Sequence, residues 1–382
     1  MIFRKTITYA LILCLIIILP VSMFMPKSAV ASLNGTLDMV SLGDSIGYGL
    51  GASAGQGYSE LFYSYLQSRP ELAGTRLYNL SQPGAQSCDL LDQLESDGNL
   101  KGHLGNARVV TVSIGGNNLL EPVIWCVATA YHLDPTDPKL DDKLDKAIES
   151  DKNQNNTLLR VALSETLETE LNAGVTKFKE NWPKVAELLK TQAPKSQIYV
   201  LTVYNPFPQD DLLFSLFDPY VQQINSTIKA GDGYTTADIY TYFREESAQK
   251  PLNFDLFQDQ IDPHPTQQGH KMISQILTIL FNLADASPWE SKAGVVTNKT
   301  WTIKFNMPLA DSAGKFVQVY TATGLPVNVT VKLGGVGSDS LSVFPPPNGY
   351  SSGPYSLLIK DGLLSESSRK LDRSVRMDFT VE

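Results

Sequence analysis

Short apolar runs alternate with amphipathic stretches along the first three quarters of the chain. The amphipathic stretches repeat their apolar residues at helical spacing, at residues 56–68, from about 89, from 175 and from 267. The apolar runs are rich in β-branched and aromatic residues, which predicts strands at residues 37–42, 76–80, 108–114, 197–203 and 235–240. Because strands alternate with helices, the pattern predicts an α/β domain with a parallel sheet covered on both faces.

A long insertion separates the third and fourth predicted strands. Residues 134–156 are charged and rich in Pro, Asp and Lys, which predicts an exposed loop or a short helix. A helix that begins near Val175 carries Phe178 and Trp182 on its apolar face, a pattern typical of core packing. Pro183 lies inside this pattern and is expected to kink or restart the helix.

The pattern changes after about Ser287, where helical spacing stops. Six short runs then alternate apolar and polar residues between Gly, Pro, Asn and Asp, at residues 300–305, 316–320, 327–333, 341–344, 355–359 and 376–381. This pattern predicts a β-sandwich over residues 290–382. The preceding α/β domain is then expected to span residues 32–286.

The N-terminus has the organisation of a targeting segment. Arg4 and Lys5 precede a long apolar run, and Ala29-Val30-Ala31 offers small residues for cleavage. We therefore expect residues 1–31 to be a signal peptide and the protein to be secreted or displayed on the cell surface. The apolar run is long for a signal peptide, so an uncleaved membrane anchor is the alternative.

Charge and cysteine content restrict the classes of partner. The chain of 382 residues has a formal net charge of -9, which argues against a nucleic-acid partner because phosphate binding needs a basic surface. No Cys/His cluster has zinc-ligand spacing, and no metal or organic cofactor is expected. Cleavage after Ala31 leaves Cys88 and Cys126, which either form a disulfide or stay as two separate buried thiols.

Four motifs carry the candidate chemistry, and three of them follow predicted strands: Gly43-Asp44-Ser45, Pro83-Gly84-Ala85, Gly115-Gly116-Asn117 and, later, Asp262-Pro263-His264-Pro265. The carboxyl ends of parallel strands share one edge of a sheet, so the first three motifs should converge there. Acyl transfer needs a nucleophile, a base, a group that orients the base, and oxyanion donors. Ser45 can be the nucleophile and His264 the base. The oxyanion donors can be the Ser45 and Gly84 N–H groups and the Asn117 amide. Gly43, Gly47 and Gly49 are expected to leave space for a substrate.

These motifs resemble the four sequence blocks of the SGNH/GDSL hydrolase superfamily, in the same order, and the resemblance covers about residues 37–284. It implies a flavodoxin-like, three-layer α/β/α fold and the hydrolysis of esters. The third block of the family usually reads Gly-x-Asn-Asp, whereas this chain has Asn118 in the last place. The residues Tyr204-Asn205-Pro206-Phe207 form either a structural turn or a wall of the substrate cleft.

The acid of the catalytic triad is the second departure from the family pattern. The family places it three residues before the histidine, where this chain has Ile261. Asp262 lies two residues before His264, and in an extended chain such side chains point the same way, with Cα atoms about 6–7 Å apart. We predict Asp262 as the acid. Asp259, or a backbone carbonyl in place of a carboxylate, is the alternative.

The C-terminal region resembles a bacterial Ig-like domain of surface-layer proteins, at residues 301–309 and 375–380. Such a domain implies attachment to the cell wall, contact with polysaccharide, or spacing. The whole chain is interpreted as an exported serine esterase acting on short-chain or lipid esters. The alternatives are an O-deacetylase of cell-wall or plant polysaccharide, and an adhesion protein whose hydrolase fold is inactive.

Overall fold

The computed structural model describes residues 38–151, 157–255, 260–335 and 337–382. The expected signal peptide, residues 1–31, lies outside this part of the chain. No helix within the described residues is long and apolar enough to cross a membrane. The chain divides after Gln275 into two compact units.

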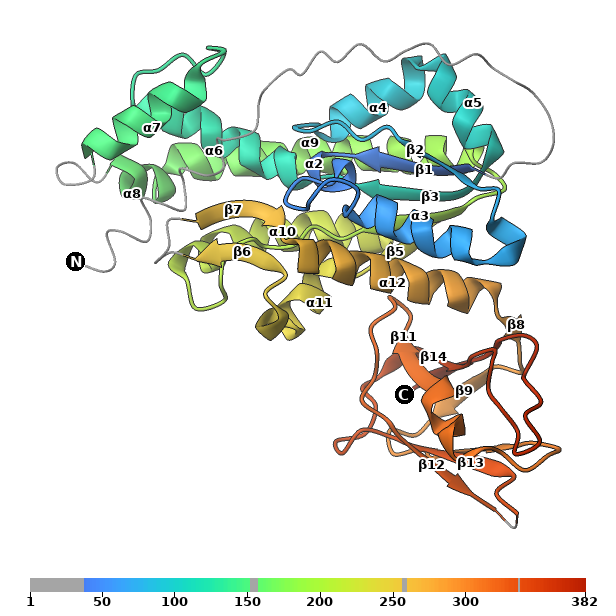
Figure 1. The fold of residues 1–382 in the computed structure, drawn as a ribbon. Coiled ribbons are helices and arrows are strands. Elements are labelled where there is room, and N and C mark those ends of the chain that lie inside the picture. The colour runs from blue at the N-terminus through green and yellow to red at the C-terminus, as the bar shows by residue number, and fades with distance from the viewer. Residues whose placement is uncertain (1–37, 152–156, 256–259, 336) are drawn as a thin grey trace. The chain divides into compact units, whose positions relative to one another are not determined.

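The first unit is built on a parallel sheet of five strands in the order β2-β1-β3-β4-β5 (Figure 1). The strands are β1 (Asp38–Gly43), β2 (Arg76–Asn79), β3 (Ala107–Ser113), β4 (Gln197–Leu201) and β5 (Thr235–Ala237). This order is the flavodoxin-like one, in which the chain reverses its direction of travel across the sheet between β1 and β3. The predicted α/β fold is therefore confirmed, and the reversal point marks where a ligand cleft is expected.

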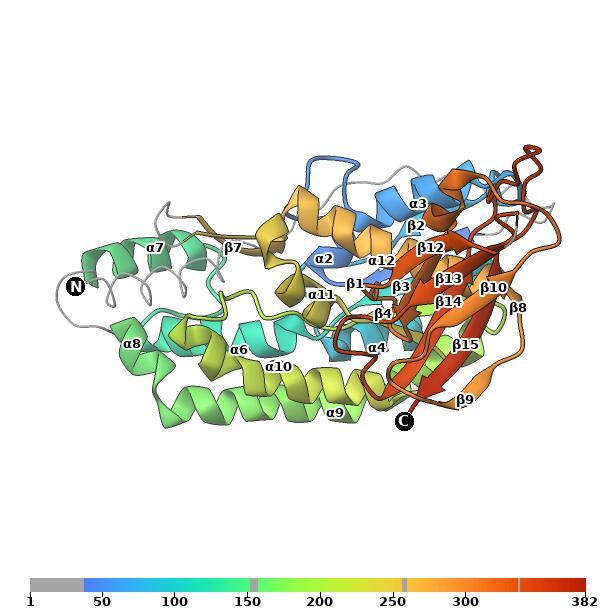
Figure 2. The ribbon, with the colours of Figure 1, turned by 90° about the horizontal axis from the view of Figure 1, so that it is seen from below.

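Helices cover both faces of the sheet (Figure 2). One face carries α4 (Ser87–Ser96), α6 (Gly116–Ala130), α9 (Glu165–Gln192) and α10 (Leu212–Ala230), and the other carries α3 (Tyr58–Ser68) and the start of α12 (Gln267–Asp285). Alternate residues of β1 divide between the faces. Val40 and Leu42 belong to the core shared with α4, α6 and α9. Ser41 points to α3, where its hydroxyl bonds that of Ser59 at 2.8 Å.

The remaining elements of this unit are short. They are α2 (Ser45–Tyr48), η2 (Pro70–Leu72), α5 (Gly98–Asn106), α7 (Leu140–Asp151), α8 (Thr157–Ala162), α11 (Ile239–Glu245), η3 (Ser247–Gln249), β6 (Leu252–Asp255) and β7 (Gln260–Pro265). β6 and β7 form an antiparallel pair apart from the main sheet. Their position beside α12 brings the segment that carries His264 to this unit's strand ends (Figure 1).

Two local predictions need correction, and one open alternative is decided. The helix near Val175 begins earlier, at Glu165, and continues through Pro183 without a break. The fifth strand stops at Ala237, because Asp238 caps α11 through its side chain. Helix α7 accounts for part of the charged insertion at residues 134–156, which makes the short helix the better of the two alternatives.

The second unit comprises the second half of α12 and the β-strands that follow it. One sheet has the order β10-β13-β12, and the other has the order β11-β14-β15-β8, with β9 also paired to β15. The strands are β8 (Ser287–Pro288), β9 (Lys292–Val295), β10 (Trp301–Lys304), β11 (Val317–Thr321), β12 (Thr330–Gly334), β13 (Ser340–Phe344), β14 (Gly353–Ile359) and β15 (Val375–Val381), and η4 covers Asp311–Phe316. All six predicted strands are present. One apolar cluster joins the two sheets, and the Trp301 and Phe379 rings lie 5.0 Å apart within it.

The two cysteines within the described residues are free thiols. Cys88 is half-buried in α4, and Cys126 is buried in α6. Burial raises the pKa of both thiols. The structure therefore has the second of the two expected arrangements, two separate thiols, and not the Cys88–Cys126 disulfide.

Candidate active site

Ser45 lies immediately after the first strand, as the first residue of α2. The Asp44 side chain caps this helix by accepting a hydrogen bond from the Ile46 N–H at 3.1 Å. Gly43 adopts a φ of +121°, and a Cβ there would lie 1.8 Å from the Ser113 carbonyl oxygen of β3. At Gly43 the missing side chain therefore makes room for the neighbouring strand rather than for a substrate, which corrects the expectation for this glycine.

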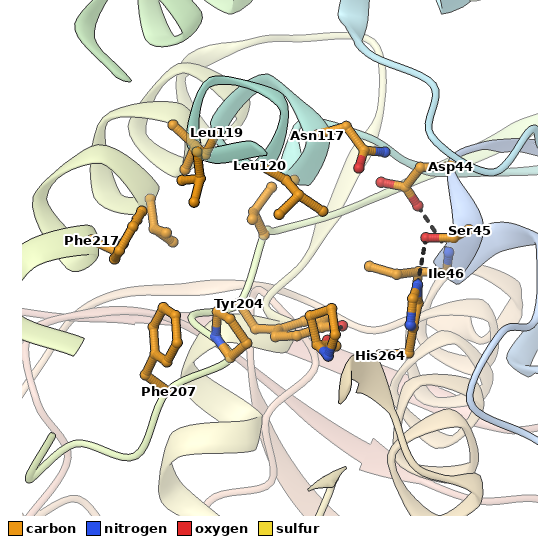
Figure 3. Close-up of a pocket in the computed structure, with 16 residues that line it drawn as sticks. Asp44, Ser45, Ile46, Asn117, Leu119, Leu120, Tyr204, Phe207, Phe217 and His264 are labelled. Atoms are coloured by element: carbon orange, nitrogen blue, oxygen red, sulfur yellow. Dashed lines mark hydrogen bonds between the residues drawn. The ribbon is translucent and has the colours of Figure 1, made fainter. Parts of the chain in front are cut away.

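Ser45 and His264 meet across 219 residues of sequence. The Ser45 Oγ and the His264 Nε2 are 2.9 Å apart, and the two side chains face each other in Figure 3. Ser45 is 8% exposed and His264 is 6% exposed, so bulk water has little access to the pair. A hydroxyl in hydrogen-bond contact with an imidazole is the arrangement that activates a serine nucleophile. The predicted pair is thus brought together.

The group that orients His264 is only partly described. β7 is an extended strand over residues 260–265. The position of the Asp262 side chain and the whole of residue Asp259 lie outside the described part of the chain. Asp262 therefore stays a prediction.

Asp44 is a buried carboxyl group beside the nucleophile. Its Oδ1 accepts a hydrogen bond from the Ser113 hydroxyl at 3.1 Å as well as from the Ile46 N–H. Burial raises the pKa of Asp44 to about 6, although both hydrogen bonds and the charge of His264 act in the opposite direction. These contacts make Asp44 a brace that joins α2 to the end of β3.

Asn117 lines the cavity at Ser45 from the first turn of α6 (Figure 3). Its Nδ2 donates a hydrogen bond to the Ala85 carbonyl at 2.9 Å, which fixes the plane of the amide. The amide has a second N–H, which is available as an oxyanion donor. Gly84 does not line this cavity; it precedes Ala85 in a turn where its φ is +84°. The Asn117–Ala85 bond joins the two predicted donor segments.

Comparison with known proteins decides which family has this arrangement. The model of the GDSL-like lipase/acylhydrolase family matches residues 41–272, which is more than half of the chain and contains Ser45, Asn117 and His264. The chain belongs to this family. It is a carboxylic ester hydrolase of the GDSL type. The comparison with curated proteins found no match.

Solved structures with a similar fold include several esterases. A lipase from a goat rumen metagenome shares 19% sequence identity, covers 64% of this chain and 96% of its own, and has a TM-score of 0.45. Phospholipase A1 from Streptomyces albidoflavus shares 17% identity, with 62% and 95% coverage and a TM-score of 0.41. An acetylxylan esterase from Geobacillus stearothermophilus shares 17% identity, with 63% and 92% coverage and a TM-score of 0.36.

Asn118, the departure from the usual GDSL pattern, is fully buried between three helices. Its Oδ1 accepts the Ser87 backbone N–H at 3.1 Å, and its Nδ2 lies 3.1 Å from the Ser87 hydroxyl and 3.5 Å from the Gly174 carbonyl. An amide suits this position because it accepts on one side and donates on the other. Asn118 thus anchors the start of α4, directly after the Gly84–Ala85 turn. The sequence marks this position but does not reveal its partners.

The cavity of this esterase is almost wholly apolar beyond Ser45. It has a volume of about 110 Å³, and Figure 3 shows Leu119 and Leu120 on one side of it and Phe207 on the opposite side, with Phe217 at its end. Tyr204 lines the same cavity and donates a hydrogen bond to the Pro263 carbonyl at 2.7 Å, next to His264. Tyr204, Pro206 and Phe207 line this cavity, and the Phe207 N–H also donates to the Asn205 Oδ1 at 3.2 Å, so the segment is both a turn and a wall of the cavity.

The loop after α2 ties the serine segment to the histidine segment, a contact that the sequence did not predict. His270 of α12 accepts the Tyr58 N–H at 3.2 Å and bonds the Leu50 carbonyl at 2.8 Å, and burial lowers its pKa. Gly51 adopts a φ of +91°, and a Cβ there would lie 2.2 Å from the Pro265 carbonyl oxygen and 2.9 Å from the His264 Cβ. The backbone at Gly51 is therefore in direct contact with the segment that carries His264.

Proposed function

We propose that the protein is an exported serine esterase that cleaves esters of short to medium, apolar acyl chains. The observation that carries this proposal is the Ser45–His264 contact of 2.9 Å at one end of an apolar cavity. An apolar cavity of about 150 Å³ in another protein holds the six carbons of a benzene molecule, so about 110 Å³ has room for roughly four carbons of an acyl chain. This lining favours such chains over acetyl groups, because burial of each methylene contributes about 0.8 kcal/mol.

The proposed mechanism passes through an acyl-enzyme. His264 takes the proton of the Ser45 hydroxyl while the Oγ attacks the ester carbonyl carbon, and the oxyanion accepts hydrogen bonds from the Ser45 N–H, the Gly84 N–H and the Asn117 amide. Collapse of this intermediate breaks the bond to the alcohol, which leaves with the proton from His264. Water then repeats the sequence on the acyl-enzyme and releases the acid. Each oxyanion donor is expected to contribute about 3 kcal/mol to the barrier reduction.

A chain-length series of p-nitrophenyl esters tests this proposal. We expect the highest kcat/KM between the butanoate and the hexanoate, and no turnover by Ser45→Ala. Val123→Phe, which fills the cavity from α6, is expected to move the optimum toward acetate. Activity restricted to acetate in the unmodified protein would instead favour a polysaccharide O-deacetylase. No turnover of any ester would favour an inactive, adhesive protein.

Asp262 is proposed as the triad acid, and a pair of variants separates it from Asp259. Loss of the carboxylate that orients His264 is expected to lower kcat strongly, by up to about 10⁴-fold. We expect this loss for Asp262→Asn and not for Asp259→Asn. The reverse result would identify Asp259, and activity in both variants would leave the orientation of His264 to a backbone carbonyl.

Export and surface contact are proposed for the two ends of the chain. Cleavage after Ala31 predicts that the exported protein begins at Ser32, which N-terminal mass analysis of culture medium tests.

The C-terminal strands are proposed to form an Ig-like domain that contacts cell-wall polysaccharide. Sedimentation of the full-length protein with purified cell walls, compared with that of a variant ending at residue 275, tests this contact.

A further inference from the structure

A second, larger cavity borders the active site of the same unit. Its volume is about 630 Å³, which lies within the range typical of small-molecule sites. Tyr204, Pro206 and Phe207 line both this cavity and the acyl cavity, so the segment 204–207 is their common wall. Thr266 and Gln267, which follow His264 closely in sequence, also line it. The second cavity therefore lies beside the segment that carries the catalytic histidine.

The formal charges in this second cavity are all positive. Arg244 and Lys250 are its charged lining residues, and neither forms an ion pair with any residue that the structure describes. The Arg244 guanidinium lies 5.4 Å from the centre of the Tyr240 ring, so an aromatic face supports it. The nearby carboxylate of Asp218 accepts the Tyr240 hydroxyl and does not line the cavity. Both side chains are exposed, and because no acidic residue that the structure describes lines the cavity, they favour an anionic ligand.

Lys250 is held in an unusual backbone conformation at the edge of this cavity. Its φ is +51°, in the left-handed region, where a glycine would be free of strain. The Lys250 carbonyl accepts a hydrogen bond from the Thr266 hydroxyl at 2.9 Å, and the Thr266 N–H bonds the adjacent Pro251 carbonyl at 2.8 Å. Lys250 is the C-cap of η3, and a left-handed residue commonly ends a helix in this way. These bonds fix the backbone of Lys250 against the residues that follow His264.

We propose that this cavity receives the alcohol half of the ester and that this alcohol carries a phosphate group, bound by Arg244 and Lys250. The proposal rests on the proposed function, in which the acyl chain fills the apolar cavity and His264 protonates the leaving alcohol. A phosphate has several acceptor oxygens, so it can bind the planar fork of an arginine and the ammonium of a lysine together. The phosphate belongs either to a lipid headgroup or to a soluble phosphorylated alcohol.

Matched substrates test this site. The full-length protein is assayed on the hexanoyl ester of glycerol and on the hexanoyl ester of glycerol 3-phosphate, which differ only in the phosphate. We expect a higher kcat/KM for the phosphorylated ester, through a lower KM. The double variant Arg244→Gln, Lys250→Gln is expected to lower kcat/KM for that ester by about tenfold or more. Its activity on the neutral ester and on p-nitrophenyl hexanoate should stay within twofold of the unmodified protein.

A control variant removes the same charge elsewhere. Lys177 and Lys184 are exposed on α9 and do not line either cavity. The double variant Lys177→Gln, Lys184→Gln should leave the preference for the phosphorylated ester unchanged. An equal loss in both double variants would show a long-range charge effect and overturn the proposal.

The other outcomes separate this proposal from the esterase function. Equal kcat/KM for the two glycerol esters, with normal p-nitrophenyl hexanoate turnover, would overturn the phosphate site and leave the esterase intact. Absence of all turnover would contradict the proposed function itself. Competitive inhibition by free glycerol 3-phosphate would support a soluble substrate. Inhibition only by vesicles that contain phosphatidylglycerol, lost in the Arg244→Gln, Lys250→Gln variant, would support a lipid headgroup.

Discussion

Substitution of Gly51 by alanine tests how the esterase positions His264, its proposed base. A Cβ at this residue would lie 2.2 Å from the Pro265 carbonyl oxygen and 2.9 Å from the His264 Cβ. Both atoms belong to the short segment that places the His264 ring against Ser45. The chain must therefore move at this point, either at the loop that contains Gly51 or at the segment that carries His264.

The size of the effect follows from the contact distances. An ordinary carbon–oxygen contact is about 3.2 Å or more, so the clash at Pro265 requires a displacement of roughly 1 Å. A misplacement of this size in a catalytic group can lower the rate by about 100-fold, which corresponds to about 2.7 kcal/mol. Alanine in the left-handed conformation adds a destabilisation of about 1–2 kcal/mol that has no direct effect on the rate.

Gly55 provides the matched control. Its φ is +74°, but a Cβ there would meet no atom within 4 Å. Gly55→Ala thus has the same backbone penalty without the clash. We expect kcat on p-nitrophenyl butanoate to fall about 100-fold in Gly51→Ala and less than threefold in Gly55→Ala. Active sites are counted by titration with a serine-directed phosphonate, so that misfolded protein does not enter kcat. Equal kcat values in the two variants would refute the role of this contact.

Three further predictions concern the supports around Ser45. Asn118→Leu removes the acceptor for the Ser87 N–H and is expected to lower kcat about tenfold with little change in KM. Asn118→Asp keeps an acceptor and should keep most of the activity. Equal losses of kcat in the two variants, measured in steady-state assays, would contradict this prediction. Because the folded-state pKa of Asp44 is raised from 3.8 to about 6, its ionisation destabilises the fold. The free energy of unfolding of the unmodified protein, relative to that of Asp44→Asn, should therefore fall by about 3 kcal/mol as the pH rises from about 3 to about 7. Urea unfolding at each pH measures this difference. A pH-independent difference would refute this assignment. Tyr204→Phe removes the hydrogen bond to the Pro263 carbonyl but keeps the ring. We expect kcat to fall several-fold, while the acyl-length preference in the p-nitrophenyl series stays the same. A changed preference would mean that the ring has moved.

The convergence of Ser45 and Asn117 was predictable because it depends on topology. Parallel strands place their carboxyl ends at one edge, so a serine after the first strand and an asparagine after the third must lie near each other. His264 was assigned as the base because acyl transfer needs one and because its motif resembles the last block of the SGNH/GDSL pattern. The fold and the candidate pair thus depend on patterns of many residues, which a single sequence expresses well.

The supports of the site were not predictable, because each depends on one contact between distant segments. The sequence gives no reason to separate Gly51 from any other loop glycine. Only the structure shows that it lies against the Pro265 carbonyl. Gly43 reads as space for a substrate, but its space is taken by the backbone at Ser113. Asn118 stands out against the family pattern, yet only the packing of α4 and α9 shows why an amide is suited to it.

The helix through Pro183 shows how tertiary packing overrides a local signal. A proline inside a helix removes one hydrogen bond and favours a break. Here Phe178, Trp182 and Val185 are buried in the core on both sides of Pro183. Their burial stabilises the helix by several kcal/mol, which exceeds the cost of one missing bond. The helical spacing across Pro183 was therefore the stronger predictor.

Helix α12 has a consequence for any attempt to use the two units as interchangeable modules. The division after Gln275 lies inside this helix, ten residues before it ends at Asp285. Within the second unit, Leu283 and Ala286 share an apolar cluster with Tyr320 and Leu358 of the strands. A cut at the apparent linker near residue 286 would separate Leu283 from the strands that it packs against. The apolar end of α12 would then be exposed to water. A transplantable β module should instead begin at about Ile276 and keep the second half of the helix as its own cap.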